Sequence, residues 1–177
     1  MPPSVARIGL IGAESTGKTT LAARLGTLLP ACVASEALRE FVERHGRTPR
    51  AEEQAGVMRA QMAAEDHAAA SCAHDVVIGD PAPLMTAVYS QAYFDDDRLL
   101  DEAVADTLRY SLVVWCDPDM PWAPDHGHRD GPGHRDLVHG LLAHVVHDRL
   151  EPAGLTVLVA RGTLEERAEL VRRAWQP

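Results

Sequence analysis

A glycine-framed run near the amino terminus carries the residue types best suited to chemistry. Residues 12–19 read G-A-E-S-T-G-K-T, which fits the pattern G-x-x-x-x-G-K-[ST] without a gap. Glycines let the backbone curl so that its N–H groups face a phosphate, and a following helix adds its positive end. In such a loop Lys18 reaches the β- and γ-phosphates, and the Thr19 hydroxyl ligates Mg²⁺. The nucleotide contacts are expected from Gly12, Glu14, Ser15, Thr16, Gly17, Lys18, Thr19 and Thr20.

The lysine in this run stands out in the composition. Lys18 is the only lysine among seventeen basic residues, so arginine replaces lysine everywhere else. The alternative interpretation is a structural glycine turn that joins a strand to a helix. An apolar run before the glycines and a helical pattern after them are the context that the phosphate-binding interpretation requires. We therefore expect an ATP site, with Mg²⁺ as its companion ion.

Two acidic residues follow other apolar runs and are candidates for the same site. Asp80 ends the run at residues 75–80 and is expected to help hold the metal, although it also fits a capping aspartate before Pro81. Glu36 is placed to accept the proton of a substrate hydroxyl, or is simply a helix-start glutamate. Arg39 lies about one helical turn after Glu36, and it either binds substrate or pairs with Glu36.

The segment at residues 117–134 holds four prolines and three glycines, which predicts a mobile lid loop. Arg129 and Arg135 are candidates to close over the transferred phosphate, where a guanidinium stabilises developing charge. Both also fit the description of solvated loop arginines. Trp122 either stacks on a substrate ring or anchors the base of the loop.

Secondary-structure patterns predict the frame that positions these side chains. Apolar runs of strand length occur at residues 5–11, 31–35, 75–80, 112–116 and 155–160. Helical patterns occur at residues 18–29, 36–44, 50–70, 84–93, 96–108, 135–150 and 163–175. This alternation predicts a three-layer α/β sandwich with a five-stranded, mainly parallel sheet and right-handed crossovers.

Length and composition exclude several classes of protein. A length of 177 residues fits one domain over residues 1–177, and a formal charge of −9 argues against coating nucleic acid or anionic membrane. No apolar run has the length of a membrane span and no secretory leader is apparent, so we expect a cytoplasmic protein. The cysteines Cys32, Cys72 and Cys116 are odd in number and far apart, so we expect no disulfide and buried, small apolar roles.

Four stretches together resemble one branch of P-loop proteins: the nicotinamide riboside kinase domain of bifunctional NAD-biosynthesis regulators and the related AAA-type ATPase-like proteins. They lie in order between residues 6 and 135 and read G-A-E-S-T-G-K-T-T-L-A, S-E-A-L-R-E-F-V, G-D-P-A-P-L-M-T-A-V-Y and P-D-M-P-W-A-P-D-H-G-H-R. The resemblance implies a P-loop NTPase fold with a lid. Implied catalytic residues are Lys18, Glu36, Asp80 and Arg129; implied substrate-binding residues are Glu36, Arg39, Trp122 and Asp125; implied metal ligands are Thr19 and Asp80.

The activity implied by the resemblance is ATP-dependent transfer of the γ-phosphoryl group to a hydroxyl of a nucleoside-like substrate, with nicotinamide riboside as one candidate. Ser35 replaces an aromatic residue of the riboside kinase pattern, Ala82 replaces its second acid, and His126 interrupts its lid sequence. The acceptor therefore stays open. Alternatives are a deoxynucleoside or nucleotide kinase, and an ATP-binding switch or ATPase that regulates a protein partner. The oligomeric state and the choice between ATP and GTP also stay open.

Overall fold

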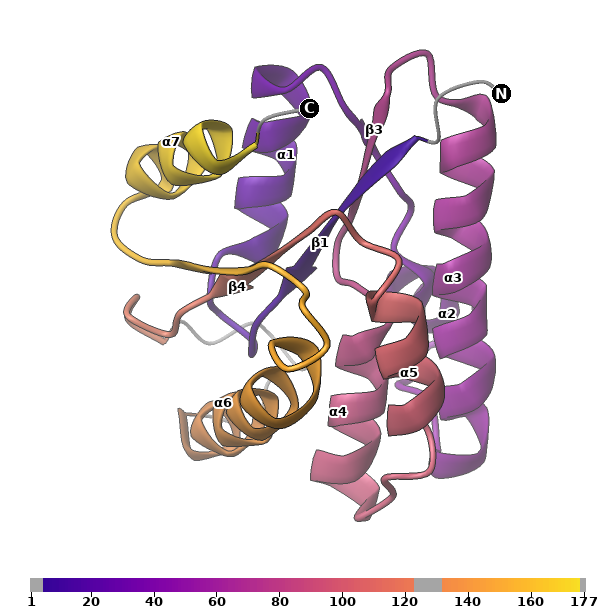
Figure 1. The fold of residues 1–177 in the computed structure, drawn as a ribbon. Helices are drawn as coiled ribbons and strands as arrows, with labels where there is room; N and C mark the ends of the chain where they lie inside the picture. Colours follow the sequence, from indigo (N-terminus) through magenta and orange to yellow (C-terminus); the bar gives the residue numbers. More distant parts are fainter. Residues whose placement is uncertain (1–4, 123–131, 176–177) are drawn as a thin grey trace.

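A parallel β-sheet forms the middle layer of the molecule (Figure 1). The computed structural model describes residues 5–122 and 132–175, and within them the sheet has five strands in the order β2-β3-β1-β4-β5. The strands are β1 (Ala6–Ile11), β2 (Cys32–Val33), β3 (Val76–Gly79), β4 (Leu112–Cys116) and β5 (Val157–Ala160). Strands β3 and β4 are buried along their whole length, which explains why they read as continuous apolar runs. The predicted sheet is confirmed.

Helices cover both faces of the sheet. They are α1 (Lys18–Leu28), α2 (Ala37–His45), α3 (Gln54–Ser71), α4 (Leu84–Phe94), α5 (Leu100–Thr107), α6 (Pro132–Val145) and α7 (Leu164–Ala174), with a 3₁₀ turn η1 (Ala51–Glu53) and a π-helical turn η2 (Val146–Leu150). Helices α1 and α7 pack on one face, and α3, α4 and α6 pack on the other. The three-layer arrangement is therefore confirmed. No helix in the described ranges is long and apolar enough to cross a membrane.

Two predicted boundaries are wrong. Helix α5 begins at Leu100 rather than at residue 96, because the Asp96 carboxylate accepts the Arg98 backbone N–H at 3.1 Å and forms a turn there. Helix α6 begins at Pro132 rather than at residue 135, since proline lacks the N–H that the first helical position leaves unused. The predicted lid loop at residues 117–134 thus overlaps α6 at residues 132–134, and residues 123–131 lie outside the described ranges.

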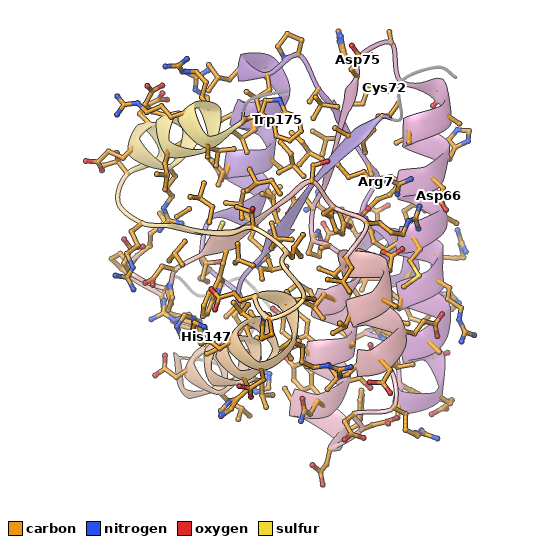
Figure 2. The ribbon with its side chains drawn as sticks, viewed as in Figure 1. Arg7, Asp66, Cys72, Asp75, His147 and Trp175 are labelled. Carbon is orange, nitrogen blue, oxygen red and sulfur yellow. A yellow bond between two sulfur atoms is a disulfide. The ribbon has the colours of Figure 1, made fainter. Side chains whose placement is uncertain are left out.

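The expectation that no cysteines pair is wrong. Cys32 and Cys72 form a disulfide, with their Cα atoms 5.9 Å apart although 40 positions separate them in sequence. Cys32 lies beside Val77 in the pairing of β2 with β3, and Cys72 ends α3 just before β3 begins. Figure 2 shows Cys72 close to Asp75, at the end of β3 opposite to the predicted site. Cys116 is free and buried, as predicted.

Candidate active site

The loop between β1 and α1 adopts a backbone that demands glycine at two positions. Gly12 has φ 148°, and a Cβ there would lie 2.8 Å from the Cys116 carbonyl oxygen. Gly17 has φ 79° and precedes the first residue of α1. Ser15 also has a positive φ, 55°, which is uncommon for a residue with a side chain. The loop therefore curls at the amino-terminal end of α1, where the helix dipole favours an anion.

The side chains of this loop stabilise it from within. The buried Thr16 hydroxyl donates to the Ala13 carbonyl at 2.7 Å. The Lys18 ammonium donates to the carbonyl oxygens of Gly12 and Ala13, both at 2.7 Å. Burial lowers the pKa of Lys18, while nearby acidic groups oppose this shift. The ammonium thus folds back onto its own loop, where two backbone carbonyl oxygens are its hydrogen-bond acceptors.

A carboxylate and a hydroxyl meet beside the loop in an arrangement that fits Mg²⁺. Asp80 follows β3, is only 5% exposed, and shares a hydrogen bond with the Thr19 side chain. Burial raises the pKa of Asp80, against the effects of Thr19, Lys18 and Arg39. The Asp80 Oδ1 atom is buried with no hydrogen-bond partner among the described residues. A hard cation prefers such oxygen ligands, so a buried, unpartnered carboxylate oxygen next to Thr19 suits it.

A second acid lies at the end of the neighbouring strand. Glu36 is the residue before α2, and its Oε2 lies 3.2 Å from an Arg39 guanidinium nitrogen. Burial raises the pKa of Glu36; Arg39 lowers it, Asp80 raises it and Lys18 lowers it. Four charged groups from three stretches of the sequence therefore share one electrostatic environment. A carboxylate with a raised pKa in such a site suits proton transfer.

Of the remaining predicted lid and substrate-binding residues, the structure describes Trp122 and Arg135 only. Trp122 is half-buried, and its indole Nε1 is buried with no hydrogen-bond partner in the described ranges. Asp125 and Arg129 lie outside the described residues. Arg135 donates to the Met120 carbonyl at 2.9 Å, so it anchors the chain that leaves β4.

Sequence reasoning missed a buried arginine behind the loop. Arg167 on α7 is 2% exposed and donates Nη1 to the Thr16 carbonyl at 2.7 Å. Its Nε donates to the Gly162 carbonyl at 2.9 Å, and its Nη2 contacts the Asp117 carbonyl and the Asp119 carboxylate. One guanidinium therefore connects the loop between β1 and α1 to the segments that follow β4 and β5.

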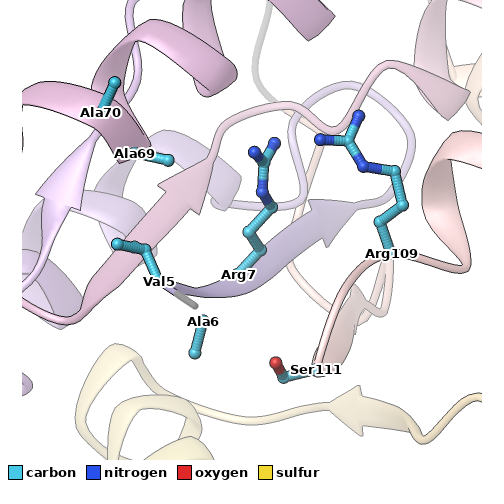
Figure 3. A pocket seen from close by; sticks show the side chains of 7 residues that line it. All are labelled: Val5, Ala6, Arg7, Ala69, Ala70, Arg109 and Ser111. Atoms are coloured by element: carbon cyan, nitrogen blue, oxygen red, sulfur yellow. The ribbon is translucent and has the colours of Figure 1, made fainter. Parts of the chain in front are cut away.

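The hollow in Figure 3 lies at the amino ends of β1 and β4, at the opposite end of these strands from the candidate site. It has a volume of about 520 Å³ and is lined by Val5, Ala6, Arg7, Ala69, Ala70, Arg109 and Ser111. Arg7 and Arg109 both donate to the Asp66 carboxylate, at 2.6 and 2.7 Å, and Figure 2 shows Arg7 and Asp66 side by side. The charges that face this hollow are therefore compensated within the protein.

Known structures share this fold. A NadR protein in complex with NR matches at a TM-score of 0.75 and 21% identity, covering 96% of this chain and 50% of that one. A NadR protein in complex with NAD and AMP-PNP matches at 0.75 and 22%, covering 98% and 51%. Deoxyadenosine kinase from M. mycoides with dCMP and dCDP bound matches at 0.67 and 12%, covering 95% and 97%.

The chain spans about half the length of the NadR chains that it matches. No curated protein matches it in sequence. Residues 7–167, from β1 through the buried arginine of α7, match the sequence profile of a family described as an AAA domain. The chain therefore belongs to this AAA domain family of P-loop proteins.

Proposed function

We propose that the protein is a MgATP-dependent phosphotransferase that transfers the γ-phosphoryl group to a hydroxyl of a nucleoside-like small molecule. One observation carries the proposal. Lys18, Glu36 and Asp80 follow β1, β2 and β3 respectively, and they lie close enough to influence one another's pKa. Such a set combines a phosphate-binding cation, a metal-binding carboxylate and an acid beside the acceptor, which is what phosphoryl transfer requires.

Each of these residues has a distinct role in the proposed reaction. Backbone N–H groups of residues 12–19 bind the phosphates, and Lys18 exchanges its carbonyl partners for phosphate oxygens. Thr19 and Asp80 would hold Mg²⁺, which supplies charge neutralisation on the phosphates when bound. Glu36 orients the acceptor hydroxyl and accepts its proton. Catalysis then arises mainly from positioning and electrostatic stabilisation.

Nicotinamide riboside is the first acceptor that we propose. The sequence resemblance to riboside kinase domains supports it, and so does the shared fold with a NadR protein whose structure contains NR. Deoxynucleosides come second, because the deoxyadenosine kinase fold covers 95% of this chain. In either case we assign Arg39, Trp122 and Asp125 to the substrate and Arg129 to the transferred phosphate, on the basis of the sequence motifs.

The test combines an acceptor panel with substitution of the sole lysine. The protein is incubated with MgATP and nicotinamide riboside, deoxyadenosine, deoxycytidine or thymidine, and ADP and phosphorylated product are measured. We expect acceptor-dependent ADP release by the wild type and a loss of about a thousandfold in Lys18→Ala. Arg98→Ala, which removes an exposed arginine paired with Asp96, serves as the control with unchanged turnover.

Two results would overturn this proposal. Full turnover by Lys18→Ala would remove the phosphate-binding role of the loop. Slow ADP release that no acceptor accelerates would instead identify an ATPase or switch. Circular dichroism of each variant verifies that the fold is intact.

A further inference from the structure

Three buried polar side chains, which the proposed mechanism does not use, form a chain of hydrogen bonds. Glu65 and Gln61 on α3 are 1% and 3% exposed, and Tyr110 before β4 is also buried. The Tyr110 hydroxyl donates to Glu65 Oε2 at 2.6 Å, and Gln61 Nε2 donates to Glu65 Oε1 at 3.4 Å. The backbone N–H of Ala37 donates to Gln61 Oε1 at 2.9 Å. The chain thus runs from the start of β4 to the start of α2.

The sheet makes room for these polar groups at one pair of glycines. Gly9 on β1 and Gly79 on β3 are partners in the strand register. A Cβ on Gly9 would lie 3.0 Å from the Tyr110 ring, and a Cβ on Gly79 would collide with the Glu65 carboxylate. Gly9 therefore makes room for the Tyr110 ring, and Gly79 lets the Glu65 carboxylate lie against the backbone of β3.

This network reaches the chain neighbours of both site acids: Gln61 binds Ala37, and Glu65 lies against Gly79. Ala37 follows Glu36 directly, and Gly79 directly precedes Asp80. We infer that Gln61, Glu65 and Tyr110 are positioning residues that set the separation between the Glu36 and Asp80 carboxylates. The inference deepens the proposed function and rests on it.

Hydrogen-bond polarity explains why these residue types are required. The amide of Gln61 can accept from Ala37 only while its Nε2 faces an acceptor, and the Glu65 carboxylate provides that acceptor. Arg7 on β1, with a nitrogen 4.0 Å from Glu65 Oε2, and Asp106 on α5 are the charged groups that also act on Glu65. A fully paired buried network of this kind rigidifies its surroundings.

The first test separates positioning from a general structural role. In Gln61→Leu we expect kcat to fall about tenfold while KM for ATP stays within about twofold, because only the acceptor side moves. Gln54→Leu is the matched control: Gln54 is a buried glutamine on the same helix, and its Nε2 donates to the Pro49 carbonyl at 3.2 Å. In a Glu36→Gln background Gln61→Leu should have little further effect on kcat. Equal losses in the control, or additive losses with Glu36→Gln, would overturn the inference.

A second test exchanges the two polar groups. Gln61→Glu alone places two carboxylates face to face and should lower kcat by at least the same factor. Adding Glu65→Gln restores every donor and acceptor, because the amide at position 65 then donates to the carboxylate at position 61 and accepts from Tyr110. Recovery of kcat in the exchanged pair supports the inference, and failure to recover in a folded protein contradicts it.

A third measurement needs no acceptor and therefore distinguishes this inference from the proposed function. Hydrogen exchange of the Ala37 amide, followed by NMR, should be about tenfold faster in Gln61→Leu than in the wild type or in Gln54→Leu. Unchanged protection of Ala37 would overturn the positioning role. Lost protection together with no phosphorylated acceptor would refute the proposed function and still support control of the Glu36 backbone by Gln61.

Discussion

The amino ends and the carboxyl ends of the parallel strands, here called the amino edge and the carboxyl edge of the sheet, differ in how their charged residues are paired. At the amino edge Arg7 and Arg109 share the Asp66 carboxylate, and their hydrogen bonds lower the pKa of Asp66. At the carboxyl edge burial lowers the pKa of Lys18 and raises the pKa of Asp80. The first set of charges is compensated by ion pairs, whereas burial shifts the pKa values of the second set. The comparison teaches that buried groups with shifted pKa values, rather than the size of a hollow, mark the site.

Removing charge at the carboxyl edge should harm turnover without harming the fold. Asp80→Asn keeps the shape of the side chain and its hydrogen bond to Thr19 but loses the carboxylate that we propose to hold Mg²⁺. We expect turnover to fall about a thousandfold, which corresponds to about 4 kcal/mol of transition-state stabilisation. The melting temperature should hold or rise, because burial of the ionised Asp80 carboxylate is unfavourable. A large loss of stability would place Asp80 with the compensated charges instead.

The disulfide should contribute to stability and little to chemistry. Cys32 and Cys72 close a loop of 40 residues, for which loop-closure entropy gives about 4 kcal/mol. We expect Cys72→Ser to lower the free energy of unfolding by up to about this amount under oxidising conditions, with turnover changed less than about twofold. Denaturant titrations with and without a reductant measure the effect, and the reduced wild type should match the variant.

The Glu65 carboxylate links stability to pH. Burial raises its pKa from 4.5 to about 7, so the folded state binds a proton that the unfolded state releases between these values. This contribution to the free energy of unfolding therefore decreases as the pH rises from about 4.5 to 7, by about 3 kcal/mol in total. In Glu65→Gln this decrease should be absent. Urea denaturation at pH 5, 6, 7 and 8 compares the two proteins, and parallel curves would contradict the prediction.

The smallest effect belongs to the exposed pair at the amino edge. Asp66→Asn removes the carboxylate shared by Arg7 and Arg109, both partly accessible to solvent. We expect a loss of less than about 1 kcal/mol in the free energy of unfolding, decreasing further at high salt. Turnover should be unchanged. A marked change in turnover would show that the amino edge takes part in function.

Local chemistry made much of the fold predictable. The phosphate-binding loop follows from its own residues, since the glycines and Lys18 act within one continuous stretch. The buried strands were visible as apolar runs because helices cover both faces of the sheet. The capping box of Thr163 and Glu166 at the start of α7 likewise lies within four consecutive residues.

Features that depend on strand order were not predictable. The Cys32–Cys72 disulfide requires that β2 pair with β3, which no local pattern encodes. The contacts of Glu65 require the Gly9 and Gly79 partnership across two strands. Arg167 is one of three arginines in α7, and only its place on the same helix face as Ala168 and Val171 could have marked it as buried. Its partner Thr16 is 151 positions away, however, and only the folded chain reveals it.

That distance has a consequence for how the protein matures during synthesis. Thr16 and the curl around it leave the ribosome 151 positions before Arg167 does. Until then the Thr16 carbonyl lacks its guanidinium partner, so the finished geometry of the loop is delayed. Nucleotide capture by a nascent chain would therefore report that α7 has docked.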